Sequence, residues 1–409
     1  MVVSESAVSD LDPLEIERLR RIILAYSGEK MLLELNDEKV LKALGFIREE
    51  NGIQHPTIGG ILMVGKVSAI KRFIPTGMSA FQVLEGTQVR VNEDYTLPIL
   101  AAIEKIISHI DAWNPEHELG FGLFRMSIPE FDHRAIREAI VNAFSHRDYS
   151  KMGRVRGAID DNGLIVANPG SFIEGISIQN LLTAEPHGRN PLLADALKRI
   201  GLAEKTERGI DRIFEGFLQY GRPLPDYSQS TSTTVSLFIP RSKPDIELVR
   251  IIADEQNRIG RPMPLNALFV LNTLKDIPRS SVGQIAEAAH LPETSVKIVL
   301  DKMIENGMIE AYGGGRGRNY MLSHNLYHSD KERLIGYVQQ RDIDEAKYPE
   351  MILSMAKEHQ FIARADVVNL LHVGDAKAYR LLKGLVDRGQ LVLVDKGKRA
   401  RYKLKDANP

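Results

Sequence analysis

Glu138 and Asn142 are polar side chains one helical turn apart in an amphipathic segment, residues 134–144. The apolar residues of this segment share one face of a helix, and Glu138 and Asn142 fall on nearly the opposite face. An asparagine oxygen can ligate Mg²⁺, and a nearby glutamate can accept a proton from an attacking water. The spacing therefore allows Mg²⁺-assisted hydrolysis, although spacing alone is explained more simply by an exposed polar face.

A second set of candidate residues is basic and is concentrated toward the C-terminus. Residues 347–409 carry 13 Lys and Arg against 7 Asp and Glu, a net charge of +6, whereas the whole chain has a net charge of -1. Such an excess predicts an anionic partner. The candidate DNA contacts are Lys297, Lys302, Arg316, Arg318, Lys377, Arg380, Lys383, Lys396, Lys398, Arg399 and Arg401.

These basic residues fall in two repeated units, each with the order helix, helix, helix and hairpin. The third helices are expected at residues 292–306 and 374–389. A winged helix-turn-helix places its third helix in the major groove and its hairpin on the DNA backbone or minor groove. We therefore predict two winged helix units that bind double-stranded DNA. In the first unit Glu293, Asp301 and Glu305 would repel phosphate if they faced it.

The composition is that of an ordinary globular protein, with 409 residues, 43% hydrophobic and 26% charged. The absence of cysteine excludes disulfides, thiolate metal sites and a cysteine nucleophile. No stretch approaches the length of a membrane span, and the first residues lack the pattern of a signal peptide. We expect a cytoplasmic protein with no membrane partner.

The middle of the chain predicts an α+β domain. Helices are expected at residues 97–113, 133–144, 192–200 and 209–220, and strands at residues 155–159, 164–167 and 233–239. A further strand is expected at residues 78–84, in the N-terminal α/β segment. Asn162 and Gly163 should supply the two positive φ values of a tight hairpin turn. Arg147 and Asp148 are expected to pair and to brace the end of the preceding helix.

Residues 59–66 have the glycine and lysine spacing of a phosphate-binding loop, but Val67 stands where Mg²⁺ needs Ser or Thr. Four consecutive aliphatic residues favour a buried strand instead. The expected domains are an N-terminal α/β segment at residues 1–120, the middle α+β domain at 121–240, a linker at 241–262, and winged helix units at 263–328 and 329–409.

The motifs from Glu138 to Tyr149, Asn168-Pro169-Gly170, Arg189-Asn190-Pro191 and residues 204–212 resemble a divergent GHKL-type ATPase domain. This domain occurs in a family of bacterial transcriptional regulators that are often labelled RecG-like. In that family an AlbA domain of the Schlafen type usually precedes it and winged helices follow. A complete AlbA domain is missing here, so the sequence indicates a truncated or short family member.

The resemblance implies an α/β sandwich that binds ATP and Mg²⁺. Glu138 would be the general base and Asn142 the Mg²⁺ ligand. Asn168 and Gly170 fall where such ATPases read the adenine, and Gly209 falls in the glycine motif that holds the phosphates. Arg189 and Asn190 lie in the segment expected to cover the nucleotide. Glu207 replaces the usual glycine of the phosphate motif.

Three functions remain open on the sequence. The first is a DNA-binding transcriptional regulator whose GHKL-like domain binds a nucleotide effector or senses and dimerises. The second is an ATP hydrolase that acts on nucleic acid or in defence, and the third is a degenerate scaffold for dimerisation or interaction. A homodimer is expected because winged helix regulators commonly read paired half-sites.

Overall fold

The computed structural model describes residues 1–121, 124–185, 187–204, 209–312, 318–323, 326, 348–359, 361–371, 373–395 and 400–405. The chain divides into two compact units, Met1–Leu268 and Phe269–Pro409. Among the described residues, no helix has both the length and the apolar character that crossing a bilayer requires.

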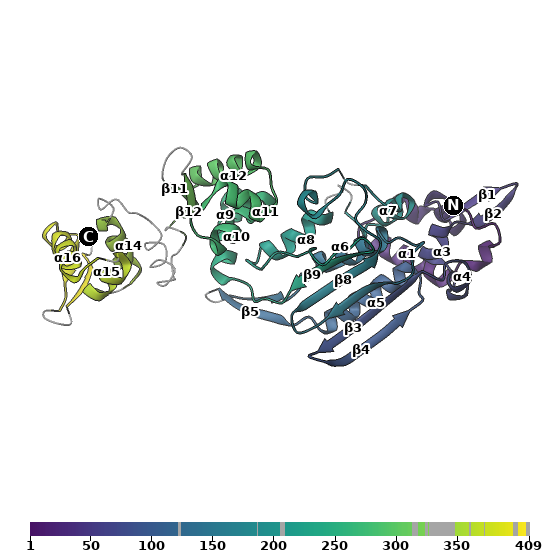
Figure 1. The fold of residues 1–409 in the computed structure, drawn as a ribbon, viewed down its shortest axis with the longest axis horizontal. Helices are drawn as coiled ribbons and strands as arrows, with labels where there is room; N and C mark the ends of the chain where they lie inside the picture. Colours follow the sequence, from purple (N-terminus) through teal and green to yellow (C-terminus); the bar gives the residue numbers. More distant parts are fainter. Residues whose placement is uncertain are drawn as a thin grey trace. The chain divides into compact units, whose positions relative to one another are not determined.

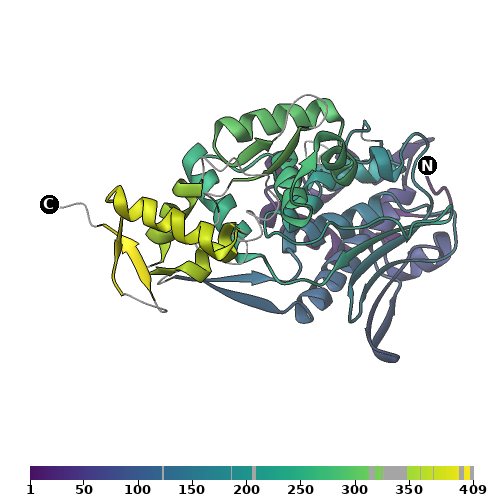
Figure 2. The ribbon, with the colours of Figure 1, turned by 60° about the vertical axis from the view of Figure 1, so that its left-hand side comes forward.

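The first unit is built on a five-stranded mixed sheet with the order β4-β3-β7-β8-β9. Only the pairing of β3 with β7 is parallel among these strands. Helices α5 (Ile99–Ala112) and α6 (His133–Ser145) lie along one face of this sheet (Figure 1, and from a second side in Figure 2). The strands are β3 (Met78–Glu85), β4 (Gln88–Tyr95), β7 (Arg154–Ile159), β8 (Gly163–Pro169) and β9 (Thr234–Pro240). The predicted α+β class is confirmed.

The remaining elements of the first unit complete the helical layer and two short hairpins. β1 pairs with β2, and β5 pairs with β6, both antiparallel. Their bounds are α1 (Pro13–Ala25), α2 (Asp37–Ala43), β1 (Ile47–Glu50), β2 (Ile53–Pro56), α3 (Ile58–Val64), α4 (Val67–Phe73), β5 (Glu116–Phe121), β6 (Phe124–Pro129), α7 (Pro191–Arg199), α8 (Gly209–Leu218), α9 (Ile246–Ile259) and the short 3-10 helices Val8–Asp10, Lys30–Glu34 and Ile178–Asn180.

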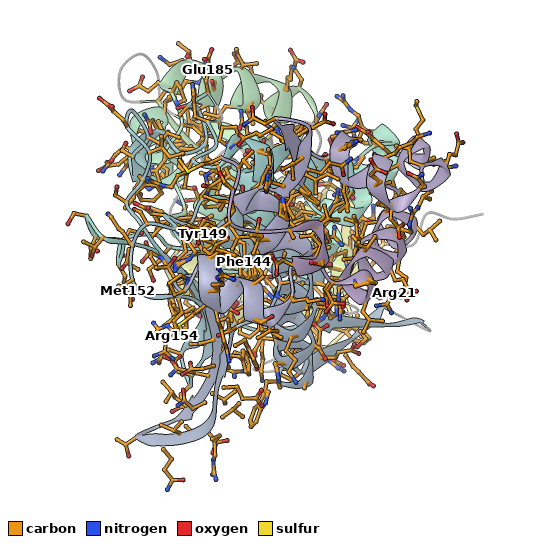
Figure 3. All side chains as sticks on the ribbon, turned by 90° about the vertical axis from the view of Figure 1, so that its right-hand side faces the viewer. Arg21, Phe144, Tyr149, Met152, Arg154 and Glu185 are labelled. Carbon is orange, nitrogen blue, oxygen red and sulfur yellow. The ribbon has the colours of Figure 1, made fainter. Side chains whose placement is uncertain are left out.

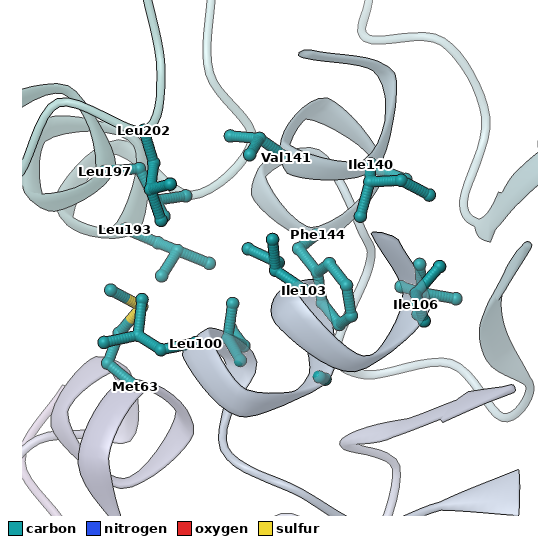
Figure 4. Close-up of a cluster of buried hydrophobic side chains, with 14 of the residues drawn as sticks. Met63, Leu100, Ile103, Ile106, Ile140, Val141, Phe144, Leu193, Leu197 and Leu202 are labelled. Carbon is teal, nitrogen blue, oxygen red and sulfur yellow. The ribbon is translucent and has the colours of Figure 1, made fainter. Parts of the chain in front are cut away.

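One hydrophobic core joins the N-terminal helices to the sheet domain. Side chains from α3, α5, α6 and α7 meet in it, among them Met63, Ile103, Phe144 and Leu197 (Figure 4). Full burial of one such side chain stabilises the fold by about 1.5–3 kcal/mol. Because β3 and β4 pair into the same sheet as β7, this sheet extends across residue 120, where the sequence suggested a change of segment.

The strand predicted over residues 59–66 is wrong, because this run forms α3. Thr57 caps the helix and accepts a hydrogen bond from the backbone N–H of Gly60 at 3.1 Å. Ile61, Met63 and Val64 are fully buried, so the helix is covered on several sides. A short apolar run without periodicity fits a buried helix as well as a buried strand. The run is therefore not a phosphate-binding loop.

The hairpin of β7 and β8 is confirmed, but its turn differs from the expected one. Neither Asn162 nor Gly163 has a positive φ. Instead the carboxylate of Asp160 accepts the backbone N–H groups of both residues at 2.8 Å. An aspartate side chain can replace the backbone geometry of a primed turn in this way.

The second unit contains the same set of elements twice. The two sheets have the orders β10-β12-β11 and β13-β15-β14, and all their pairings are antiparallel. The first set is α10 (Leu265–Asp276, which begins in the first unit), β10 (Ser280–Ser281), α11 (Val282–Ala289), α12 (Glu293–Glu305), β11 (Ile309–Tyr312) and β12 (Asn319–Leu322). The second set is α14 (Tyr348–Glu358), β13 (Ile362–Ala363), α15 (Arg364–Leu371), α16 (Asp375–Asp387), β14 (Leu391–Leu393) and β15 (Arg401–Leu404).

The repeat predicted from the sequence is thus present in the described residues, and its spacing is constant. Ser280 pairs with Tyr320 in the first set, and Ile362 pairs with Tyr402 in the second, each 82 positions later. Helices α12 and α16 keep the same offset at both ends. Residues of the two sets can therefore be compared one by one.

Candidate functional site

Helix α6 carries the polar pair singled out in the sequence. Asp132 caps the helix and accepts the backbone N–H groups of Arg134 and Ala135. Glu138 is only 5% exposed, so the exposed-face explanation fails for this residue. Asn142, one turn later, is half-buried. Burial of an unpaired charge is costly. A buried carboxyl group therefore either has a charged or hydrogen-bonding partner or holds a proton.

Gly209, the first residue of α8, lies directly against this pair. A Cβ atom at residue 209 would stand 2.1 Å from Oε1 of Glu138 and 3.3 Å from Nδ2 of Asn142. The structure therefore brings together three residues that are separated by up to 71 positions in the chain and that the sequence assigned to one site. Only glycine leaves room for the carboxylate at the start of the helix.

The electrostatics around Glu138 favour an uncharged carboxyl group. Burial raises its pKa to about 7, and the neighbouring charge of Glu204 acts in the same direction. Arg137, Arg134 and a hydrogen bond from the backbone of Glu204 oppose this shift without cancelling it. A carboxyl group with a pKa near neutrality can both hold and release a proton under ordinary conditions, as a general base must.

Ion pairs fix the charged groups that border Glu138. Glu204 lies 3.6 Å from Arg134 on α6 and 3.3 Å from Arg212 on α8. Arg212 also pairs with Glu215 at 2.6 Å. These contacts join α6 to α8 at the end where Gly209 lies.

Tyr227 is a neighbour of this site that the sequence analysis missed. Its side chain is buried, and burial together with the charge of Glu138 raises its pKa. The ring lies 6.0 Å from that of Phe172, which follows Gly170 in the chain. Tyr227 belongs to no motif, and no periodic pattern places it near α6, so the sequence offered no signal for it.

The other predicted nucleotide contacts gather at the C-terminal end of α6. Asn168 is buried in β8, and Gly170 adopts a φ of +121°. A side chain at residue 170 would crowd Asp148, whose backbone N–H donates to the carbonyl of Pro169 at 2.8 Å. The Asn-Pro-Gly turn is therefore held against the loop that follows α6.

Arg189 and Asn190 close this region with side-chain hydrogen bonds to backbone carbonyls. Arg189 donates to the carbonyls of His146 and Ser171. Asn190 donates to the carbonyls of Ser145 and Arg147 at 2.9 and 2.8 Å. Both residues thus donate hydrogen bonds to free backbone carbonyls at the end of α6 and hold this region in place. Few of their side-chain N–H groups are left to bind a ligand.

Arg147 and Asp148 do not brace the helix as a pair, contrary to expectation. The fully buried guanidinium of Arg147 donates to the carbonyls of Thr76 and Gly153. Asp148 accepts hydrogen bonds from Ser150 and lies 3.8 Å from Arg189.

The loop after α6 also folds back on the helix. Tyr149 donates its hydroxyl to the carbonyl of Phe144 at 3.1 Å, and Figure 3 shows these two residues side by side. The loop is thus tied to the helix end that Arg189 and Asn190 also contact.

The Glu138 site fits a Mg²⁺-bound nucleotide in two respects. Gly209 is the first described residue of α8, and its lack of a side chain lets the backbone of that helix approach Glu138 and Asn142 closely. Asn142 carries a neutral amide, whose oxygen is of the type that Mg²⁺ accepts and whose Nδ2 is the atom nearest Gly209. In the described residues no cluster of three acidic or histidine side chains could hold a metal ion. Mg²⁺ is commonly held by few protein ligands together with substrate phosphates.

The predicted DNA contacts differ between the two repeats. On α16, Arg380 and Lys383 are exposed, whereas Lys377 is half-buried with its ammonium group 5.3 Å from the ring centre of Tyr348. On α12, Lys297 and Lys302 are exposed, and Lys297 pairs with Glu293 at 3.3 Å.

On the hairpins, Arg318 lies 5.5 Å from the ring centre of Tyr320, and Arg401 pairs with Asp395 at 2.6 Å. Both arginines are exposed. Arg316, Lys396, Lys398 and Arg399 lie outside the described residues.

Comparison with known families identifies the class of the middle domain. Residues 154–238 match the family described as "Putative ATP-dependent DNA helicase recG C-terminal". This match supports a divergent ATPase-like domain and includes Asn168, Gly170 and Gly209, but it begins after α6. Glu138 and Asn142 therefore enter the site on geometry and not on the family match.

Two further comparisons concern the rest of the chain. Residues 1–79 match a domain family of unknown function. The crystal structure of the DIP2311 protein from Corynebacterium diphtheriae is similar over 98% of this chain and 69% of that chain, with 20% sequence identity and a TM-score of 0.63. At this identity the likeness extends to the fold alone. None of the curated proteins matches the chain.

Proposed function

We propose that this chain is a DNA-binding regulator whose ATPase-like domain binds a Mg²⁺-nucleotide. The main support for the proposed nucleotide site is the close approach of Gly209 to Glu138 and Asn142. It supports the proposal because the first described residue of α8, an asparagine amide and a candidate proton acceptor lie close together, within a unit that contains the ATPase-like match.

The residues of the site have distinct tasks in this proposal. The start of α8 binds the phosphates through backbone N–H groups, and Asn142 holds the Mg²⁺. When bound, Mg²⁺ neutralises phosphate charge and polarises the phosphoryl oxygens. Glu138 holds or accepts a proton, which its pKa of about 7 permits. Asn168 and Gly170 border the adenine of the nucleotide. Arg189 and Asn190 fix the segment around these two residues.

DNA binding is assigned to the second repeat of the second unit. The outer face of α16 presents Arg380 and Lys383 to solvent, and its repeat has the order of elements of a winged helix. The third helix of such a unit enters the major groove. Cations at i and i+3 on that helix fit the phosphate and base contacts that double-stranded DNA offers.

Thermal unfolding with and without Mg²⁺-ATP and Mg²⁺-ADP tests the nucleotide site. A ligand at 100 times its Kd stabilises the folded state by about 2.7 kcal/mol. We expect such a shift for the native chain, its loss in Asn142→Ala, and its retention in the control Asn92→Ala, whose amide lies on the exposed strand β4. An unshifted transition at saturating nucleotide would contradict the proposal and favour a scaffold.

ATP hydrolysis is the second candidate activity, and the pKa of Glu138 favours it specifically. Glu138→Gln removes the proton acceptor but keeps the volume of the side chain. If Glu138 is the general base, this variant binds nucleotide and loses turnover by about 10²–10⁴-fold. Unchanged turnover would exclude that role.

A further inference from the structure

Helices α12 and α16 are equivalent elements whose outer faces have opposite character. Both have 13 residues, and their buried positions correspond across the offset of 82: Val296 and Leu300 on α12 match Ala378 and Leu382 on α16. All four are fully buried. The two helices therefore turn the same face to their own cores, and their outward positions correspond as well.

At the centre of the outward face the two helices carry different residues. Arg380 of α16 corresponds to Ile298 of α12, and Lys383 corresponds to Asp301. Ile298 is 58% exposed, although an isoleucine usually lies inside a protein. The two positions at which α16 offers cations to an anionic partner thus hold an apolar and an acidic residue on α12.

The remaining charges of α12 make its face unsuited to DNA. Lys297 already pairs with Glu293 in the same helix, and Lys302 stands between Asp301 and Glu305. The exposed residues Glu293, Lys297, Asp301, Lys302 and Glu305 sum to a charge of -1. Phosphate binding needs a net positive surface.

The same face is complementary to itself. Lys297 and Asp301 lie one turn apart along one side of the face, and Ile298 lies beside them at its centre. When two copies cross antiparallel about a two-fold axis near residue 299, each Lys297 faces the other copy's Asp301 and the two Ile298 side chains meet beside the axis. A helix crossing near 50° separates the ends, so Glu293 and Glu305 remain solvated.

We propose that the outer face of α12 is the surface through which two copies of this chain associate. A two-fold contact requires a patch that is complementary to itself, and this face satisfies that condition. The dimer carries two α16 helices, which is the arrangement that paired half-sites on DNA require. The duplicated units have thus diverged, one toward DNA and one toward a second copy.

Sedimentation equilibrium of the full chain over a concentration series tests this proposal without DNA or nucleotide. The native chain self-associates, and Ile298→Arg raises the dissociation constant about tenfold or more, equivalent to about 1.4 kcal/mol. The control Ile53→Arg, at an isoleucine 60% exposed in β2, leaves association unchanged.

Charge reversal distinguishes a direct self-contact from damage to the fold. Lys297→Glu and Asp301→Lys each weaken association, because each places like charges opposite one another across the axis. The double variant Lys297→Glu/Asp301→Lys restores the opposite pairing and with it the association.

Three results overturn the proposal. The first is a native chain that is monomeric throughout the series, and the second is a dimer insensitive to Ile298→Arg. The third is a double variant as weak as the singles. An Ile298→Arg chain that binds DNA more tightly with unchanged association would place DNA, and not a second copy, on α12. Sedimentation equilibrium measures mass and not nucleotide binding. A negative result therefore does not bear on the proposed nucleotide site.

Discussion

The backbone of Gly209 lies directly against the carboxylate of Glu138, with space for hydrogen and for no larger side chain. A Cβ at residue 209 would stand 2.1 Å from Oε1 and 3.0 Å from Cδ of Glu138. This contact joins the start of α8 to the middle of α6 and fixes the distance between the candidate base and the candidate phosphate-binding N–H groups.

Gly209→Ala is expected to abolish nucleotide binding while the fold persists. The methyl group overlaps Glu138, so either the carboxylate or the first turn of α8 must shift. Overpacking of this kind costs about 1–3 kcal/mol. Gly283→Ala is the control, because a Cβ there meets only Glu293 at 3.6 Å. Undiminished binding by Gly209→Ala would show that this contact does not shape the site.

The stability of the chain is expected to fall with rising pH because of Glu138. The folded chain keeps the proton up to about pH 7, whereas the unfolded chain loses it near 4.5. The stabilising contribution is therefore present below pH 4.5 and is lost between pH 4.5 and about 7.

Glu138→Gln keeps the uncharged form at every pH. Above pH 7 the free energy of unfolding of this variant should exceed that of the native chain by about 3 kcal/mol. Near pH 4.5 the two free energies of unfolding should be equal. Urea unfolding at both pH values measures this difference. Glu17→Gln, on the exposed face of α1, is the control. Equal stability of Glu138→Gln and the native chain at high pH would mean that Glu138 is ionised without cost.

Arg222 is a buried cation whose replacement should stabilise the protein. Its side chain is 2% exposed, and among the described residues none accepts a hydrogen bond from its three nitrogen atoms. Burial lowers its pKa, while Glu130 and Asp132 act in the opposite direction. Arg222→Met should raise the free energy of unfolding by about 1–4 kcal/mol, and Arg222→Lys should not. A large loss of stability in Arg222→Met would reveal an ion pair.

DNA affinity is expected to depend on α16 through its exposed cations. Each phosphate contact contributes about 0.9 to the slope of log K against log salt concentration. Arg380→Ala/Lys383→Ala should flatten that slope by about 2 and weaken binding, as fluorescence anisotropy would show. Lys302→Ala on α12 is the control and should leave the slope unchanged. A steep slope that persists in the double variant would move the interface away from α16.

Much of this fold could be predicted from the sequence where local patterns are strong. The amphipathic helices α5 and α6, the β7–β8 hairpin and the duplicated C-terminal order all follow from periodicity and turn residues. Helix α3 was missed because four consecutive aliphatic residues have no period. Strand β4, rich in charged residues, was missed because it is an edge strand with polar exposed positions.

The site was predictable only in part, for a related reason. Glu138, Asn142 and Gly209 are predicted to share a site because their motifs resemble a GHKL-type ATPase domain, although no local pattern brings residues 138 and 209 together. Tyr227 and Arg222 are placed by tertiary packing alone. Lys377 is half-buried against Tyr348, 29 positions away in the sequence, a contact that no local pattern indicates.

Isothermal titration calorimetry of Mg²⁺-ATP into the native chain and into Asn142→Ala tests the nucleotide site most directly. We expect saturable binding at one site per chain, loss of the Mg²⁺-dependent part of the affinity in Asn142→Ala, and unchanged binding in Asn92→Ala. No heat of binding to the folded native chain, or equal affinity in Asn142→Ala, would contradict the assignment of Glu138, Asn142 and Gly209 as the nucleotide site.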